Sequence, residues 1–260
     1  MITSSLRVPK HGNSQQECED ALHVRTDADV VCAAVSDGAS ESLLAGAWAD
    51  LLARSVNDAA RDDEGVLRDV DRFATALVDA GEAWREWLVG YVAGREADGR
   101  PIAWYEQPKL DRGPHATVLA ARFDADPSGV VRWRAAALGD SCLFRVRDDE
   151  PLPGFPVTSA EAFGSSPDLV NAFNRDHALL ARHVSAVSGD ARPGDEFFLC
   201  TDALAAWFLH EAERGDRPWR ALGEFTKSGD LDGFTSWLTA TRAEGVLRND
   251  DVAVVHVDLG

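Results

Sequence analysis

The sequence predicts an α+β fold in which two packed, mainly antiparallel β-sheets carry helices on their outer faces. Short β-type runs occur early, in the middle and at the end of the chain, and helical patterns are grouped between them. Short polar connections between neighbouring β-runs favour antiparallel pairing. The 260 residues contain no internal repeat and no long linker, so we expect one domain over residues 1–260.

The N-terminal third reads as two strands followed by two helices. Residues 21–25 and 30–36 are β-type runs separated by a polar turn. We expect Ser40 or Ser42 to cap the first helix. The apolar face of that helix comprises Leu43, Ala47, Leu51 and Val56. The second, longer helix carries an apolar stripe at steps of three, four or seven residues, made of Val66, Val70, Phe73, Leu77, Trp84, Trp87 and Tyr91.

The middle of the chain is rich in β-type runs. Residues 115–123, 130–138 and 141–147 are three candidate strands, and their short connections predict an antiparallel meander. Three prolines and one glycine predict a loop over residues 151–156. Residues 157–182 are irregular, with one or two short helices expected.

Two further strands are expected at residues 183–187 and 196–200, separated by the turn-rich segment 188–194. Two or three helices follow, and residues 252–257 form a final apolar strand. The apolar positions of these helices include Leu204, Trp207, Phe208, Leu231, Phe234, Trp237 and Leu238.

Composition excludes several functional classes. The chain has 26 Lys and Arg against 44 Asp and Glu, a net charge of −18, which opposes binding to nucleic acid or to anionic membranes. It shows no signal peptide and no apolar run of membrane-spanning length. The four cysteines form no C-x-x-C pair, which favours a reduced, cytoplasmic protein. Apart from His11, the histidines form no spaced ligand pair and are expected to be structural or solvated.

Aspartates recur at the ends of the predicted strands. A single aspartate at such a place is most simply a turn residue. Five of them on one sheet edge would repel one another unless cations lay among them. Carboxylates suit Mg²⁺ or Mn²⁺, and two such ions sharing a carboxylate can activate a water molecule. The five sites are Asp20, Asp37, Asp140, Asp202 and Asp250.

Short segments around these aspartates occur in a recognisable order. They are Cys18-Glu19-Asp20-Ala21, Val35-Ser36-Asp37-Gly38, Gly113 through Thr117-Val118, Leu138-Gly139-Asp140-Ser141, Leu199-Cys200-Thr201-Asp202 and Asn249-Asp250-Asp251-Val252. This ordered set resembles the metal-dependent protein phosphatases of type 2C, and the leading segment is similar to a divergent bacterial branch. The resemblance implies a four-layer α-β-β-α sandwich with a two-metal centre at one edge.

The resemblance also implies residue roles. Asp37 would bridge two Mn²⁺ or Mg²⁺ ions, and Gly38 would offer its backbone carbonyl to one of them. Asp202 and Asp250 would complete the shell of the other ion, and Asp20, with its neighbouring glutamate, would hold water on a metal. Asp37 and Asp20 are thus the expected catalytic pair.

Two further expectations follow from the resemblance. Asp140 matches a position that helps to bind a weaker third ion in bacterial members. Residues 155–182 fall where the family carries a flap-like insertion near the site. The implied substrate is a phosphorylated protein, the target of a cognate Ser/Thr kinase.

Three positions depart from the family pattern. Gln15 stands where the family usually has a phosphate-binding arginine, and Lys10 or His11 is the candidate substitute for substrate binding. Ala39 stands where many members have a histidine that is a proposed general acid. Ala203 replaces a glycine, which removes only backbone freedom.

Three functions therefore compete. The first is a phosphoserine/phosphothreonine phosphatase that uses metal-activated water. The second is a catalytically weak relative that acts as a regulatory or binding module. The third is a metal-dependent hydrolase of small phosphoesters.

Overall fold

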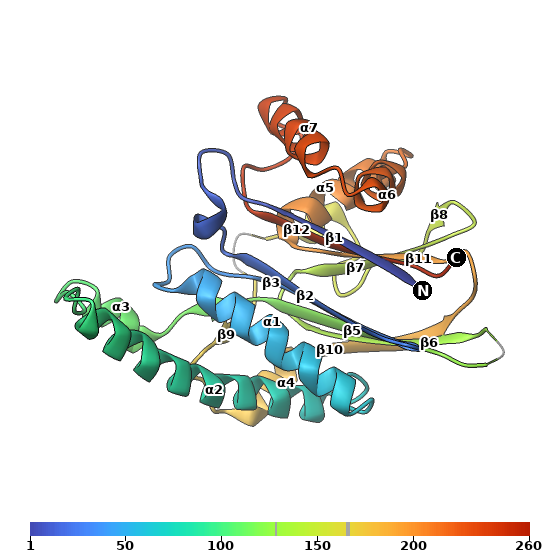
Figure 1. The fold of residues 1–260 in the computed structure, drawn as a ribbon. Helices are drawn as coiled ribbons and strands as arrows, with labels where there is room; N and C mark the ends of the chain where they lie inside the picture. Colours follow the sequence, from blue (N-terminus) through green and yellow to red (C-terminus); the bar gives the residue numbers. More distant parts are fainter. Residues whose placement is uncertain (128, 165–166) are drawn as a thin grey trace.

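The computed structural model describes residues 1–127, 129–164 and 167–260. Two five-stranded sheets pack face to face, with helices on both outer sides (Figure 1). All their strand pairs are antiparallel, which confirms the predicted α+β sandwich. Among the described residues, no helix combines the length and the apolar character that a membrane span requires.

The first sheet contains both ends of the chain. Its strand order is β1 (Ile2–Val8), β12 (Val252–Asp258), β11 (Glu196–Cys200), β7 (Cys142–Arg147) and β8 (Glu150–Pro151). The helices α5 (Asp202–Glu213), α6 (Pro218–Ser228) and α7 (Leu231–Ala243) cover its outer face (Figure 1).

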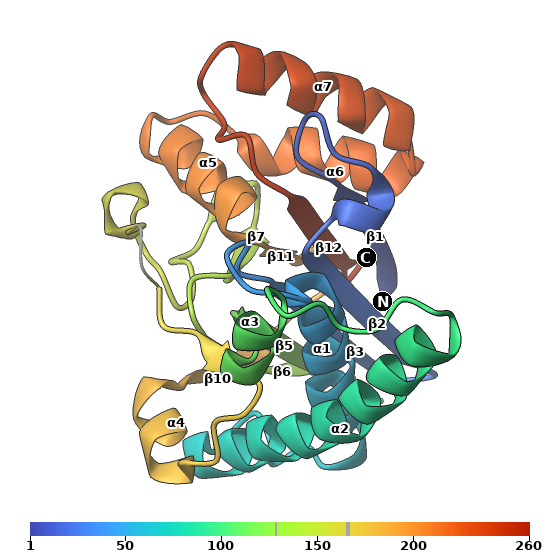
Figure 2. The same cartoon turned by 90° about the vertical axis from the view of Figure 1, so that its left-hand side faces the viewer.

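The second sheet carries the other helical layer. Its strand order is β10 (Ser185–Ala191), β6 (Val131–Leu138), β5 (Val118–Ala125), β3 (Val30–Asp37) and β2 (Asp20–Asp27). Helix α1 (Ala45–Asp62) packs on this sheet, and α2 (Val70–Ala97) crosses the outer side of α1 (Figure 2). The remaining elements are η1 (Gln15–Glu17), α3 (Gln107–Arg112), β4 (His115–Ala116), η2 (Ala160–Ala162), β9 (Val170–Asn171) and α4 (His177–His183).

The central core lies between the two sheets. Buried side chains such as Val35 and Phe123 from one sheet meet Phe197 and Val255 from the other. The strands also bury their opposite faces under the helices, so they are apolar on both sides and place their ends at fixed positions relative to one another.

The predicted meander over residues 115–147 is wrong in its third strand. Strands β5 and β6 pair, but β7 lies in the first sheet beside β11. Cys142 and Phe144 pack under the outer helices and Leu143 packs between the sheets. Both faces of β7 are buried, so its sequence does not indicate which sheet the strand joins. The short connection to β6 therefore favoured pairing of β7 with β6.

Other expectations also need correction. Strand β1 was not predicted, because its polar residues Thr3, Ser4 and Ser5 weaken the β pattern. Helix α1 is capped by Leu44, with a φ of 65° and no side-chain cap, instead of by a serine. Strand β10 begins after His183 and continues through the predicted turn at 188–191, because pairing with β6 overrides the turn residues.

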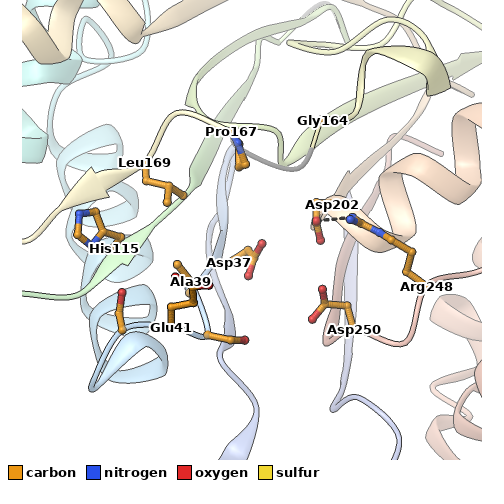
Figure 3. A pocket seen from close by; sticks show the side chains of 13 residues that line it. Asp37, Ala39, Glu41, His115, Gly164, Pro167, Leu169, Asp202, Arg248 and Asp250 are labelled. Carbon is orange, nitrogen blue, oxygen red and sulfur yellow. Dashed lines mark hydrogen bonds and ion pairs between the residues drawn. The ribbon is translucent and has the colours of Figure 1, made fainter. Parts of the chain in front are cut away.

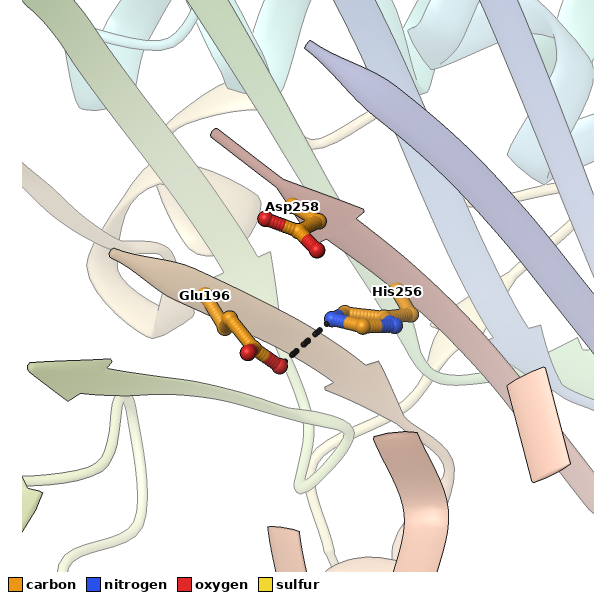
Figure 4. Close-up of side chains that lie close together, drawn as sticks. All are labelled: Glu196, His256 and Asp258. Carbon is orange, nitrogen blue, oxygen red and sulfur yellow. Dashed lines mark hydrogen bonds and ion pairs between the residues drawn. The ribbon is translucent and has the colours of Figure 1, made fainter. Parts of the chain in front are cut away.

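A cluster of titratable side chains closes α6 onto the first sheet. Glu196 and Asp258 are partners in the β11–β12 ladder, and the Lys227 ammonium lies 3.0 Å and 2.9 Å from their carboxylates. The buried His256 ring lies beside them, with its Nε2 3.0 Å from Glu196 Oε2 (Figure 4). Its Nδ1 lies 2.8 Å from Thr226 Oγ1. The Lys227 ammonium therefore already balances the negative charge of Glu196 and Asp258.

Candidate metal centre

Asp20 and Asp37 are direct neighbours in the antiparallel ladder of β2 and β3. Asp20 opens β2 and Asp37 closes β3, so the strand register alone brings the two carboxylates to one sheet edge. Asp20 is 2% exposed, and the Thr201 hydroxyl donates a 2.7 Å hydrogen bond to its Oδ2. Thr201 belongs to the other sheet's edge, so this bond joins the two sheets at the site.

Two carboxylates arrive from the first sheet. Asp202 opens α5 directly after β11, and Asp250 lies just before β12. Together with Asp37 they line a cavity of about 590 Å³ (Figure 3). Because the two sheets stack with these strand ends on the same side, residues more than 200 positions apart converge there.

The carboxylates raise one another's proton affinity. Burial raises the pKa of Asp20 well above its usual range, and the charge of Asp37 adds to the effect. Burial also raises the pKa of Asp37 strongly, followed by the charges of Asp202 and Asp250. Such a cluster stores electrostatic repulsion that a divalent cation would relieve.

Asp140 lies next to this cluster, in the connection between β6 and β7. Its side chain is 7% exposed, and its Oδ1 has no hydrogen-bond partner among the residues that the structure describes. Burial, assisted by the charge of Asp202, raises its pKa to about 6. It lines a smaller hollow that shares Gly164 and Pro167 with the main cavity. A buried oxygen without a partner fits an additional cation ligand.

Gly38 occupies a position that only glycine can fill. A Cβ there would lie 2.8 Å from the Ala45 backbone and 2.9 Å from the Glu19 carbonyl oxygen. The Gly38 N–H donates a 3.2 Å hydrogen bond to that Glu19 oxygen. The backbone at the end of β3 is thus packed closely against the start of α1, with its residues on the cavity wall.

Asp251 is a site residue whose role sequence reasoning missed. Its Oδ1 accepts a 2.7 Å hydrogen bond from the Lys10 backbone N–H, and its Oδ2 accepts a 2.7 Å hydrogen bond from the Glu19 backbone N–H. The neighbouring Asn249 accepts a 2.8 Å hydrogen bond from the His11 N–H. These bonds fix the loop before β2 against the start of β12. The adjacent Asp250 and Asp251 in the sequence were the signal that could have indicated a role for Asp251.

The candidate substrate-binding residues Lys10 and His11 lie outside the set of described residues that line the cavity. The Lys10 ammonium is 3.5 Å from Glu19 Oε2 and 3.1 Å from the Ser40 hydroxyl, which does line it. Gln15 lies in η1 and is exposed. Lys10 therefore lies outside the cavity wall, and its ammonium already contacts Glu19 and Ser40.

Arg248 is a second residue that sequence reasoning missed. Its guanidinium forms an ion pair with Asp202 and lines the cavity (Figure 3). Burial raises the pKa of Asp202, whereas Arg248 lowers it. The position of Arg248, two residues before Asp250, was a signal that could have found it.

His115 also lines the cavity. Its Nε2 lies 3.1 Å from the Asn171 amide nitrogen, and burial lowers its pKa. The contact with Asn171 fixes the position of the His115 ring at the cavity wall.

Comparisons with known proteins agree with this geometry. The family model described as Protein phosphatase 2C matches residues 9–241. No curated protein sequence matches the chain.

Solved structures share the fold over almost the whole chain. A bacterial serine phosphatase has a TM-score of 0.57 at 11% identity, with 100% of this chain and 98% of that chain covered. The S. agalactiae serine/threonine phosphatase has a TM-score of 0.55 at 13% identity, with 100% of this chain and 99% of that chain covered. The catalytic domain of the phosphatase PstP, solved with two manganese ions, has a TM-score of 0.54 at 16% identity, with 99% and 97% covered. The chain therefore belongs to the protein phosphatase 2C family.

Proposed function

We propose that this protein is a metal-dependent phosphatase that removes phosphate from phosphoserine and phosphothreonine in proteins. The observation that carries the proposal is the convergence of Asp37, Asp202 and Asp250 from both sheets at one cavity, with the buried Asp20 beside Asp37 in the β2–β3 ladder. A fold keeps so many buried carboxylates together at a cost in stability, and cations that bind a substrate would offset that cost.

The donor set suits two Mn²⁺ or Mg²⁺ ions. Asp37 interacts with Asp20, Asp202 and Asp250 and is, with Gly38, the proposed bridge. Asp202 and Asp250 would hold one ion, and Asp20 would orient water. Oxygen ligands without a Cys or His cluster favour these hard cations. Asp140 is the proposed ligand of a weaker third ion.

When bound, the ions supply charge that stabilises the phosphoryl oxygens and lower the pKa of water to make a nucleophile. The chain's own residues set the direction of attack. Thr201 holds Asp20 in one rotamer through its 2.7 Å hydrogen bond, so Asp20 can accept a proton at a fixed place. Ala39 offers no proton donor to the leaving serine or threonine oxygen at the position where many family members carry a histidine.

The substrate proposed for this site is a phosphorylated protein, the target of a cognate Ser/Thr kinase. The cavity is open and holds about 590 Å³, which is room for a phosphorylated side chain on an extended segment. Gly164, Pro167 and Leu169 contribute to its wall, which supports a flap role for residues 155–182 within one phosphatase domain; residues 165–166 of this segment lie outside the described residues. The four cysteines are free and buried, which supports a cytoplasmic location.

Hydrolysis assays with Mn²⁺ test the proposal. We expect Mn²⁺-dependent release of phosphate from a phosphothreonine peptide, at a higher kcat/KM than from a small phosphorylated metabolite. A preference for the metabolite would instead favour a small-phosphoester hydrolase. Binding of the phosphopeptide without turnover would favour the regulatory module that the residues at positions 15 and 39 suggest.

A further inference from the structure

We propose that Arg248 binds the phosphoryl group of the substrate and takes over the role of the arginine that the family places at Gln15. The inference rests on the proposed function, because it concerns the same cavity. It assigns the phosphate contact to the loop between α7 and β12, which is hydrogen-bonded through Asn249 and Asp251 to the loop before β2.

The charge inventory of the cavity supports this assignment. The cavity wall includes the carboxylates of Asp37, Glu41, Asp202 and Asp250. Arg248 is the one Lys or Arg among the described residues that form this wall. A dianionic phosphoryl group entering the cavity meets a strongly negative surface, so a cationic hydrogen-bond donor beside the metal ligands is what the substrate requires.

The guanidinium has donors to spare. One nitrogen, Nη2, donates to Asp202 Oδ2, and within the described part of the chain no other hydrogen bond of the Arg248 guanidinium occurs. Its side chain is 52% exposed, so the remaining N–H groups are open to a ligand. Arginine carries five N–H donors in a planar fork, which allows a paired contact to phosphate while one donor stays on Asp202.

The ion pair with Asp202 fixes the orientation of the Arg248 guanidinium. In Figure 3 the Arg248 side chain runs to Asp202 along the cavity wall, with Asp250 beside it and Asp37 across from it. A carboxylate offers about four lone-pair directions, so Asp202 can keep this ion pair and still ligate a cation. The guanidinium is thereby held next to the proposed metal ligands, where a phosphoryl oxygen would lie.

The other basic candidates are less suitable. Lys10 is engaged by Glu19 and Ser40 and does not line the cavity, and Gln15 is exposed on η1. The alternative role for Arg248 is that of a simple counter-ion, which balances Asp202 until a metal arrives. The two roles predict different binding data.

Isothermal titration of the full-length protein separates the roles. Orthophosphate is titrated into protein saturated with Mn²⁺, and Mn²⁺ is separately titrated into metal-free protein. The variants are Arg248→Gln and Arg248→Lys, with the exposed Arg214→Gln as the matched control. Circular dichroism confirms that each variant is folded.

We expect Arg248→Gln to weaken orthophosphate binding by about ten- to a hundredfold, as expected for loss of charge-assisted hydrogen bonds. Arg248→Lys should retain part of the affinity, and Arg214→Gln all of it. The Mn²⁺ affinity of Arg248→Gln should stay the same or rise, because a competing cation leaves Asp202. In kinetics, KM for an aryl phosphate should rise more than kcat falls.

Three results would overturn the proposal. The first is unchanged orthophosphate affinity in Arg248→Gln, which would leave Arg248 as a counter-ion. The second is a parallel loss of Mn²⁺ affinity, which would mean that Arg248 only positions Asp202. The third is a wild-type protein that binds Mn²⁺ but no orthophosphate. A protein without phosphatase activity whose orthophosphate binding still depends on Arg248 would instead refute only the proposed function.

Discussion

Asp140 makes the stability of the metal-free protein depend on pH in a direction opposite to that of most carboxylates. Its pKa rises from 3.8 to about 6 on folding, because the buried carboxylate loses solvation and faces the charge of Asp202. The folded state therefore binds a proton more tightly than the unfolded state. Stability is highest below pH 4 for this group, and it falls as the pH rises from about 4 to about 6.

The magnitude follows from the same values. Each tenfold change in proton affinity corresponds to about 1.36 kcal/mol, so the charged Asp140 side chain destabilises the metal-free fold by about 3 kcal/mol above pH 6. Asp140→Asn removes this charge and keeps the shape. The new amide group lacks a partner, which costs about 1 kcal/mol. We therefore expect a net stabilisation of about 1–2 kcal/mol at pH 7.5 and little effect at pH 4.5.

Urea unfolding in excess chelator, at pH 4.5 and at pH 7.5, measures both quantities. Wild type and Asp140→Asn are compared by the free energy of unfolding at each pH. Exposed Asp98→Asn serves as the control, because Asp98 is paired only with a surface arginine. The reasoning is refuted if Asp140→Asn is equally or less stable than wild type at pH 7.5, or if the difference does not depend on pH.

Three further outcomes are expected. Exhaustive chelation should abolish phosphatase activity, and Mn²⁺ or Mg²⁺ should restore it; full activity in excess chelator would exclude the two-metal proposal. Asp37→Asn should lower kcat far more than Asp140→Asn, because Asp37 is the proposed bridge between both ions; near-wild-type turnover at saturating Mn²⁺ would remove it from that role. Lys10→Ala should raise KM for an aryl phosphate only two- to threefold, and Gln15→Arg should leave it unchanged, since neither residue lines the cavity; a large change in either KM would return the phosphate contact to the loop before β2.

Local patterns were enough to predict that these aspartates lie close together, because the proposed ligands lie where strands end. Asp37 follows an apolar run, and Asp250 precedes one, and both facts are visible without a structure. The sandwich and its helical layers were predictable for the same reason. The spacing of apolar residues indicates which segments are strands and which are helices. Aspartates at five strand ends indicate that these ends meet at one sheet edge.

What could not be predicted depends on contacts between distant segments. Strand β7 joins the first sheet because both its faces find apolar partners there, and its own sequence does not distinguish the two sheets. Asp251 binds backbone groups more than 200 residues away. Arg248 gains its role only from the placement of Asp202 at the start of α5. Such single-residue roles carry no periodic signal.

The hydrogen bonds of Asp251 also set when the centre can form during synthesis. Lys10 and Glu19 emerge from the ribosome first, and the carboxylate that fixes their loop lies 241 and 232 residues later. Strand β12 then inserts between β1 and β11, so the first sheet is incomplete until residues 252–258 have been made. A nascent or C-terminally truncated chain lacks Asp250 and its anchoring neighbour. Under the proposed function, dephosphorylation therefore requires synthesis through β12, and translation products that stop before residue 250 remain inert.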